Sequence, residues 1–236
     1  MKSAAAFALA LAIGVTPAAV ARPAAADPVV VELFTSQGCE ECWPANQVLM
    51  ELAERPNVLA LTFAVDYWDY LGWPDSFAQP AFTDRQEAYM RGLRLRMLRT
   101  PQVIVDGAAH ASGLDEAGVL SLIAAHRGGP RGAPDAQIVS RGRRVAVASG
   151  TPPSGGADVW LVRYDPRPLS VTVRRGENRG KVVPHRNVVR ELVRLGSWTG
   201  RARTYRLPQP TVQGLKTTVL VQARRTGRVI AAADPR

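Results

Sequence analysis

Apolar residues in the first half of the chain fall into short runs that alternate with helical patterns. Residues 29–34 and 58–65 are apolar runs rich in β-branched residues, which is typical of buried strands. Residues 45–54 lie between them and carry apolar side chains at helical spacing, at Val48, Leu49, Leu52 and Ala53. The pattern predicts a strand, a helix and a second strand.

A further helix, strand and helix are expected before the middle of the chain. Residues 84–97 and 114–126 fit helices. Between them, residues 102–105 fit a strand that follows Pro101 and ends at an Asp-Gly turn. Strands that alternate with helices favour a sheet covered by helices, which makes the first half an α/β unit.

The second half changes to short strands with alternating polarity, separated by Gly, Pro and Asn turns. This pattern predicts an all-β, sandwich-like unit. Residues 187–195 stay ambiguous, because their apolar spacing fits a helix while their β-branching fits a strand. The clearest strands are residues 145–148, 159–164, 169–173 and 218–223.

Charge divides the chain at the same place. Residues 27–130 hold 7 Lys and Arg against 14 Asp and Glu, a net charge of −7, whereas residues 131–236 hold 21 against 6, a net charge of +15. The Gly- and Pro-rich segment between the halves suits a linker. We therefore expect an α/β domain over residues 27–127, a linker over 128–135 and a basic domain over 136–236.

The first 26 residues are expected to be an export signal. Lys2 precedes an apolar run over residues 4–15 that is too short to span a bilayer, and small residues offer cleavage sites between Ala21 and Ala26. The alternatives are a membrane anchor or an Ala-rich tail. No later run of eighteen apolar residues follows. The sequence therefore predicts a periplasmic or secreted protein without a transmembrane segment in its mature chain.

Cys39 and Cys42 are the only cysteines, and they lie three apart between the first strand and the first helix. At a helix start, residues i and i+3 face the same side, so the two sulfurs can bond to each other or share one metal ion. A loop this short stabilises a fold little by restricting the unfolded chain, so the pair favours chemistry. The alternatives are an inert disulfide, unused thiols or a Cu(I) site.

Disulfide exchange is the chemistry that such a pair supports best. A helix N-terminus stabilises a thiolate, so we assign Cys39 as the nucleophile and Cys42 as the residue that resolves the mixed disulfide. Glu40 and Glu41 add negative charge beside a forming thiolate, which favours a reductase or isomerase over a strong oxidant. The alternative is that both carboxylates are simply solvated.

Three segments carry a resemblance to a known family. They are Val31-Glu32-Leu33-Phe34-Thr35-Ser36-Gln37-Gly38-Cys39, Val65-Asp66-Tyr67-Trp68-Asp69-Tyr70-Leu71-Gly72-Trp73 and Thr100-Pro101-Gln102-Val103-Ile104-Val105-Asp106-Gly107. Residues 28–127 resemble the thioredoxin fold, and the three segments together resemble an exported bacterial family of unknown function, domain of unknown function twelve twenty-three. The resemblance implies a thioredoxin-like domain followed by the sandwich-like one.

The resemblance also implies roles for the residues before the third strand. Pro101 matches the proline that is cis and lies opposite the redox cysteines in thioredoxin-like proteins, and it would shape a peptide groove. Backbone groups of Thr100 would then pair with a bound peptide as an added strand. The alternative is an ordinary trans proline at the start of a strand.

Other candidate site residues surround the second strand and the cysteines. Asp66 follows the strand and is a candidate to accept the proton of Cys42, with a capping or hydrogen-bonding role that fixes the loop as the alternative. Trp43, Tyr67 and Trp68 are candidates for substrate contact, with plain core packing as the alternative. Beyond the redox-active disulfide, no cofactor is expected.

The basic half carries a dense set of cations whose target stays open. An exported chain without a nucleic-acid motif makes nucleic acid an unfavoured partner. The set would dock on the acidic half, bind an anionic envelope surface or acidic proteins, or be solvated. Three scattered histidines show no metal-ligand spacing. The cations are Arg174, Arg175, Arg179, Lys181, Arg186, Arg190 and Arg194.

The sequence thus predicts an exported thiol–disulfide oxidoreductase that acts on the thiols of envelope or secreted proteins. The alternatives are a non-catalytic binding module on the same fold and a Cu(I) metallochaperone.

Overall fold

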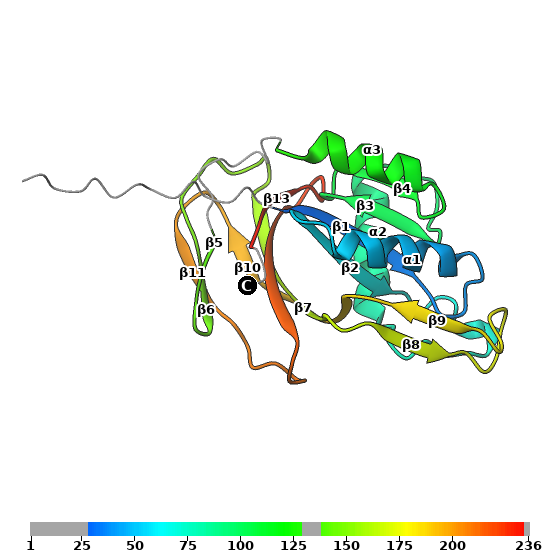
Figure 1. Cartoon of the computed structure of the whole chain (residues 1–236). Coiled ribbons are helices and arrows are strands. Elements are labelled where there is room, and N and C mark those ends of the chain that lie inside the picture. The colour runs from blue at the N-terminus through cyan, green and yellow to red at the C-terminus, as the bar shows by residue number, and fades with distance from the viewer. Residues whose placement is uncertain (1–27, 129–137, 234–236) are drawn as a thin grey trace, which may run out of the picture.

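One mixed sheet of eight strands organises the molecule (Figure 1). The structure, a computed structural model, describes residues 28–128 and 138–233. The strand order is β13-β12-β7-β10-β2-β1-β3-β4. The elements of the first half are β1 (Val29–Thr35), α1 (Cys42–Ala53), β2 (Val58–Ala64), the short 3-10 helix η1 (Asp69–Leu71), α2 (Pro80–Gly92), β3 (Gln102–Val105), β4 (Ala109–Ser112) and α3 (Glu116–His126).

The elements of the second half are almost all strands. In the described residues they are β5 (Ile138–Arg141), β6 (Arg144–Val147), β7 (Ala157–Asp165), β8 (Leu169–Thr172), β9 (Val182–His185), β10 (Val188–Trp198), β11 (Arg203–Arg206), β12 (Lys216–Ala223) and β13 (Val229–Ala232). The ambiguous segment at 187–195 is therefore a strand, because β10 pairs along its length with β7 and its β-branched side chains pack into the sheet.

Strands β1 and β2 lie at the centre of the first half and are buried on both faces. They run parallel, with Val31 opposite Ala60, whereas β3 runs antiparallel to β1. Successive side chains of these strands point to opposite faces of the sheet and so contribute to two cores. One core faces α1 and α3, and the other faces α2. This double burial explains why both runs read as continuous apolar segments.

The helix bounds differ in part from the sequence expectation. Helix α1 begins at Cys42 and not at residue 45, so Cys39 precedes the helix. Helix α2 begins at Pro80 and ends at Gly92, whereas residues 84–97 were expected. Proline fits the first helical position because its missing N–H has no partner there.

The second half extends the sheet of the first half. Strand β10 lies beside β2, with Val188 opposite Thr62. Strands β7, β12 and β13 follow β10 in the sheet, in that order. The expected division at residues 128–135, most of which lies outside the described residues, therefore does not separate two sheets. The expected signal at residues 1–26 also lies outside the described residues.

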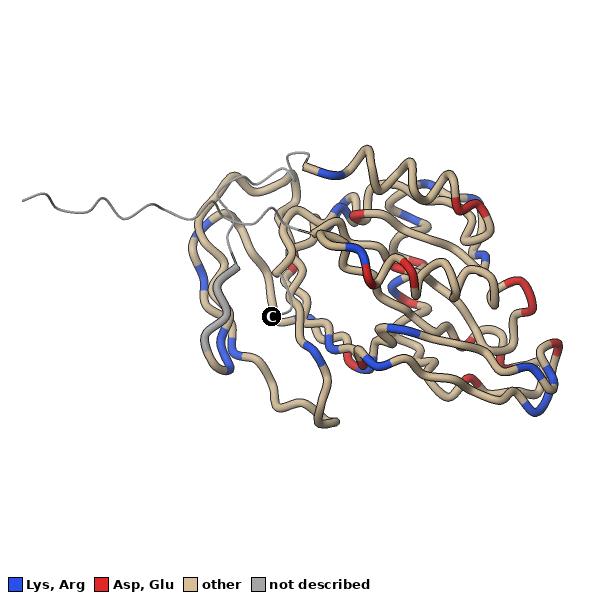
Figure 2. Tube along the Cα trace, in the orientation of Figure 1, with Lys and Arg blue, Asp and Glu red and all other residues tan. Residues whose placement is uncertain are grey.

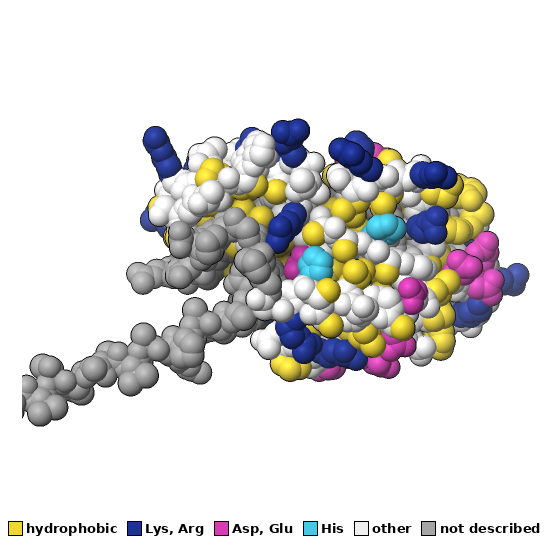
Figure 3. Space-filling model, turned by 90° about the horizontal axis from the view of Figure 1, so that it is seen from above, with side chains coloured by type: hydrophobic (Ala, Val, Ile, Leu, Met, Phe, Trp, Pro, Cys, Tyr) yellow, Lys and Arg dark blue, Asp and Glu magenta, His cyan; other side chains and the backbone are white. Residues whose placement is uncertain are grey.

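A second sheet, in the order β11-β6-β5, packs on the end of the main sheet. Val145, Val147 and Tyr205 share a core with Val159 and Val221 of the main sheet. This part of the molecule therefore packs sheet against sheet, as a sandwich of strands does. Figure 3 shows one face of the molecule, on which several basic side chains lie along the upper edge and acidic side chains are most numerous towards the right-hand end.

A buried polar network joins the two halves inside the sheet. Arg85 of α2 donates to Glu32 of β1 at 2.6 Å, and Tyr89 donates to the same carboxylate. Arg85 also reaches Gln222 of β12, at 3.2 Å. A buried charge needs such partners, so this network fixes α2 against strands from both halves.

Strands β8 and β9 form a hairpin that belongs to neither sheet. They pair only with each other among the described residues, with Leu169 opposite His185. The hairpin leaves the main sheet after β7 and returns at β10, and it lies against α1 at the end of the molecule that carries the cysteines (Figure 1).

Candidate redox site

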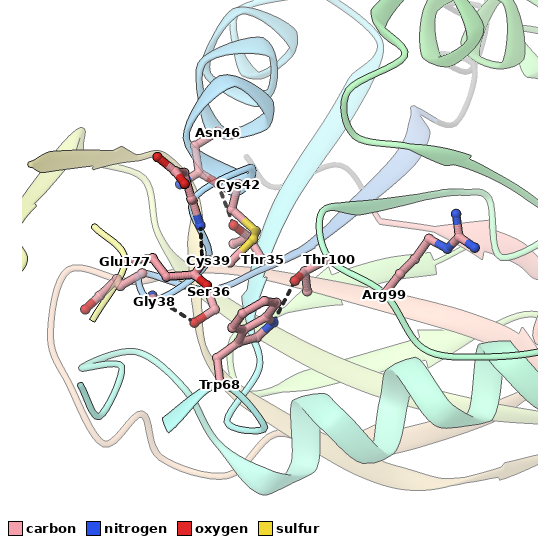
Figure 4. The surroundings of a disulfide bond; sticks show 12 residues. Thr35, Ser36, Gly38, Cys39, Cys42, Asn46, Trp68, Arg99, Thr100 and Glu177 are labelled. Atoms are coloured by element: carbon pink, nitrogen blue, oxygen red, sulfur yellow. Dashed lines mark hydrogen bonds between the residues drawn. A yellow bond between two sulfur atoms is a disulfide. The ribbon is translucent and has the colours of Figure 1, made fainter. Parts of the chain in front are cut away.

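Cys39 and Cys42 form a disulfide at the start of α1 (Figure 4). Their Cα atoms lie 5.3 Å apart, and a backbone hydrogen bond of 3.2 Å joins the N–H of Cys42 to the carbonyl of Cys39. Cys42 is the first helical residue, and Cys39 lies in the turn before it. Glu41 holds the N-cap position, so Cys39, which the sequence places at the helix N-terminus, lies one turn before the first helical residue.

One wall of the site is formed by Trp68 and Thr100. The indole Nε1 of Trp68 donates to Thr100 Oγ1 at 2.7 Å, and both residues lie beside the disulfide in Figure 4. A Cβ placed on Gly38 would lie 3.7 Å from Trp68 Cβ, so the turn before Cys39 lies close to Trp68. Trp68 and Thr100 thus form a hydrogen-bonded pair beside the disulfide.

Pro101 lies close to the cysteine helix. The Thr100–Pro101 bond is cis, as the resemblance implies, and Pro101 is buried. A Cβ placed on Gly113 would lie 2.7 Å from Pro101 Cβ and 2.9 Å from Ala45 Cβ. The glycine therefore permits a close approach between the proline segment and α1, one turn beyond Cys42.

The other expected contact residues are dispersed around this core of the site. Trp43 is more than one-third exposed, and its Nε1 donates to the carbonyl of Val182 in β9 at 3.3 Å. The Tyr67 hydroxyl donates to Gln86 of α2, and burial raises the pKa of Tyr67 to about 12. Tyr67 therefore serves the packing of α2, while Trp43 contacts the hairpin.

Two carboxylates near the site differ in their partners. Asp66 accepts a hydrogen bond from Thr83 Oγ1 at 2.6 Å, so the structure ties it to α2. Asp75 instead accepts a bond of 2.7 Å from the N–H of Gln37, two residues before Cys39. Burial raises the pKa of Asp75 to about 6. Sequence reasoning missed Asp75, since it lies in an irregular loop with no periodic signal.

The β8–β9 hairpin covers the disulfide, which sequence reasoning did not foresee. The buried side chain of Asn178 donates to the carbonyls of Gln37 and Cys39, at 2.9 and 2.8 Å. Cys39 is only 2% exposed and Cys42 is fully buried. The disulfide is therefore closed to solvent.

Part of the basic set lies at the tip of this hairpin. Arg174, Arg175 and Arg179 are exposed there, and Lys181 pairs with Glu40 at 2.9 Å. Figure 2 shows the acidic turn beside α1 and the basic hairpin tip at the same end of the molecule.

Two further basic residues belong to local contacts. Arg186 pairs with Glu54 of the acidic half, and Arg194 pairs with Asp158 of the basic half. The Arg186–Glu54 and Lys181–Glu40 pairs therefore both join the basic half to the acidic half.

The described residues show no metal centre and no membrane helix. No group of three or more His, Cys, Asp or Glu side chains gathers to hold a metal ion within residues 28–128 and 138–233. In the same ranges, no helix has the length and apolar character needed to cross a bilayer.

Comparison with known proteins places the chain in a family. Residues 30–222 match the family described as protein of unknown function (DUF1223). A crystal structure of protein AGR_C_4864 from Agrobacterium tumefaciens is 32% identical with a TM-score of 0.71, over 88% of this chain and 92% of that one. HBP35 of Porphyromonas gingivalis shares the fold at 12% identity and a TM-score of 0.52, over 88% of this chain and 74% of that one. No curated protein matches. The chain therefore belongs to the DUF1223 family.

Proposed function

We propose that this protein is an exported thiol–disulfide oxidoreductase, of the reductase or isomerase type, that acts on envelope or secreted proteins. The observation that carries the proposal is the Cys39–Cys42 disulfide at the start of α1, beside the Thr100–Pro101 segment. Chemistry at this disulfide needs a helix N-terminus to stabilise the departing thiolate, and Cys42 is the first residue of α1.

The arrangement of the first half supports a thioredoxin-like assignment. Parallel β1 and β2 flank α1, antiparallel β3 and β4 follow α2, and α3 closes the unit. Helices α1 and α3 share one core with the sheet and α2 shares the other. The cysteines follow β1 and the proline precedes β3, both at one end of the sheet, where α/β folds bind their ligands.

The exchange proceeds in two balanced steps. A client thiolate attacks Sγ of Cys39, so that a client–Cys39 bond forms and the Cys39–Cys42 bond breaks, with Cys42 leaving as a thiolate. A second client thiolate then attacks the client sulfur and releases Cys39. The client loses two electrons and becomes a disulfide, while the protein gains them as a dithiol. The reverse sequence reduces a client disulfide, with Cys39 attacking and Cys42 resolving.

Charge around the pair supports the reductive direction. Glu40 and Glu41 are exposed beside the disulfide, and each carboxylate disfavours a thiolate nearby. The ion pair of Glu40 with Lys181 offsets part of this effect while the hairpin is closed. A pair that disfavours its thiolates holds its disulfide more firmly and donates electrons more readily.

The proposal is tested with trapping variants and a scrambled ribonuclease as client. We expect Cys42→Ser to accumulate a mixed disulfide through Cys39, because the resolving thiol is gone, and Cys39→Ser to form none. The wild-type protein should restore ribonuclease activity in a glutathione buffer, and the double Ser variant should not. Asp84→Asn, which changes an exposed carboxylate of α2, serves as a control with wild-type trapping behaviour.

The competing function is a binding module with an inert disulfide. It would show no mixed disulfide with Cys42→Ser and no ribonuclease reactivation, whatever the redox buffer. That result would overturn the proposed exchange activity.

A further inference from the structure

The β8–β9 hairpin is attached to the main sheet only at its base. There, Thr62 Oγ1 donates to the carbonyl of Arg186 at 2.7 Å, and Asn187 donates to the carbonyl of Ala60 at 2.8 Å. The two strands pair with each other and with no other strand of the described residues. Lifting the tip of the hairpin therefore breaks no hydrogen bond of the main sheet.

The tip is held over the disulfide by a small number of side-chain contacts. Asn178 supplies the buried ones, through its two hydrogen bonds to the carbonyls of Gln37 and Cys39. The tip also crosses to the neighbouring loop, since a Cβ placed on Gly176 would lie 3.8 Å from the carbonyl oxygen of Leu71. Asn178 thus closes the space above the Cys39 turn.

Exposed charged contacts complete the closure. Lys181 Nζ lies 2.9 Å from a carboxylate oxygen of Glu40, and the backbone N–H of Glu40 donates to Glu177 at 3.4 Å. The acidic insert of the Cys-Glu-Glu-Cys turn therefore meets a cation of the hairpin. Exposed pairs of this kind are weak and salt-sensitive, which suits a contact that must release.

The closed arrangement leaves buried polar atoms of the hairpin without protein partners. Asn178 Oδ1 and both ring nitrogens of His185 have none. Such atoms gain hydrogen bonds with water when the surface that covers them opens. These atoms therefore lower the free-energy cost of opening the hairpin.

We propose that the β8–β9 hairpin is a cap that closes the Cys39–Cys42 disulfide and opens, with the rest of the fold intact, to admit a thiol. Asn178, the Lys181–Glu40 ion pair and the hydrogen bond from Trp43 to Val182 hold the cap shut. The inference rests on the proposed function and adds regulation of the same site. Attack on Sγ of Cys39 requires an approach along the S–S bond, which a residue only 2% exposed does not offer while the cap is closed.

The test measures the rate at which dithiothreitol reduces the disulfide in the full-length protein, by alkylation and mass spectrometry. Asn178→Ala removes two hydrogen bonds, so we expect reduction about tenfold or more faster. Lys181→Glu replaces the ion pair with repulsion, and we expect acceleration of about threefold. Arg175→Glu makes the same charge change at the exposed tip, where the described structure gives Arg175 no ion pair, and should stay within about twofold.

Two measurements separate cap opening from general destabilisation. The urea midpoint of Asn178→Ala should fall by no more than the loss of two hydrogen bonds explains. Dilute urea should change the reduction rate little, because a local opening exposes little surface. Salt at about 1 M screens surface charges. It should therefore speed reduction of the disulfide in the wild-type protein but not in Lys181→Glu.

Equal rates for Asn178→Ala and wild type would overturn the cap, as would acceleration by Arg175→Glu equal to that by Lys181→Glu. A strongly urea-dependent rate would overturn it too, since reduction would then require global unfolding. These outcomes are independent of the trapping experiment. If the variants speed reduction while Cys42→Ser traps no client, the cap stands and the exchange function fails.

Discussion

At the scale of single residues, one buried carboxylate depends on the partners that surround it. Glu32 is fully buried and accepts hydrogen bonds from Arg85 and Tyr89 at 2.6–2.8 Å. Its apolar neighbours on β1 follow from the sequence, but an acidic residue inside an apolar strand is tolerated only because Arg85 of α2 reaches it.

Replacing that carboxylate should strongly destabilise the fold. Glu32→Gln leaves the guanidinium of Arg85 buried without a counter-charge, and we expect a loss of about 3–5 kcal/mol in the free energy of unfolding. Glu87→Gln, at an exposed pair with Arg91, should cost under about 1 kcal/mol. Urea denaturation of both variants checks the difference, and equal losses would show that burial of the pair is irrelevant.

His185 should make stability depend on pH. Burial lowers the pKa of His185 from 6.5 to about 4. Between these values the unfolded chain binds a proton that the folded protein refuses, so stability is lost as pH falls from about 6.5 towards about 4. His185→Phe keeps an aromatic ring against Phe77. Between the test values of pH 7 and pH 4, this variant should lose less unfolding free energy than wild type, by up to roughly 3 kcal/mol.

The matched control is His110→Phe, because His110 is exposed on β4. Urea unfolding at the two pH values should give wild-type acid sensitivity for this variant. If His185→Phe loses as much stability in acid as wild type does, titration of His185 is not the cause.

At the scale of elements, the contact between α1 and the proline segment is limited by one glycine. Gly113 leaves no space for a methyl group, since a Cβ would meet Pro101 Cβ at 2.7 Å and Ala45 Cβ at 2.9 Å. Both neighbours are short side chains that cannot move without their backbones. The distance between the cysteine helix and Pro101 therefore depends on this position.

Gly113→Ala should separate the two elements. We expect a loss of about 1–3 kcal/mol in unfolding free energy from overpacking, measured by thermal and urea denaturation. Gly38→Ala is the comparison, because its Cβ would make contacts of 3.6 Å or longer and should cost little. Gly113→Ala as stable as Gly38→Ala would contradict the close packing.

At the scale of the whole molecule, the acidic and basic halves form one structure. Strand β10 pairs with β2, Gln222 of β12 joins the Glu32–Arg85 pair, and ion pairs link Glu40 to Lys181 and Glu54 to Arg186. Their opposite net charges favour this association, and the shared sheet makes it permanent.

The two halves should therefore unfold together. Scanning calorimetry is expected to show one transition whose calorimetric and van't Hoff enthalpies agree, because one core is built from both halves, with Phe34 packed in the same cluster as Tyr164 and Leu220, and it is lost when the sheet divides between β2 and β10. Two resolved transitions, with one half folded between them, would show that the halves are independent domains.

Local pattern predicted much of the first half and less of the site. The β1 and β2 runs, the presence of a helix next to the cysteine pair and the strand after Pro101 follow from spacing and turn residues, with errors at helix boundaries such as Pro80. Asn178 and Asp75 could not be found this way. Each acts on the segment before Cys39 from a distant loop, and such contacts leave no periodic signal in the sequence.

The sequence by itself determined that two cysteines would meet at the start of a helix, because three residues of separation bring two side chains to one face wherever that helix forms. Only the tertiary structure decided that the basic half would complete the sheet and lay a hairpin over the sulfurs. Strand pairing between β2 and β10 depends on residues 126 positions apart, at Thr62 and Val188. Their meeting is set by the burial of both halves in common cores, which no local segment encodes.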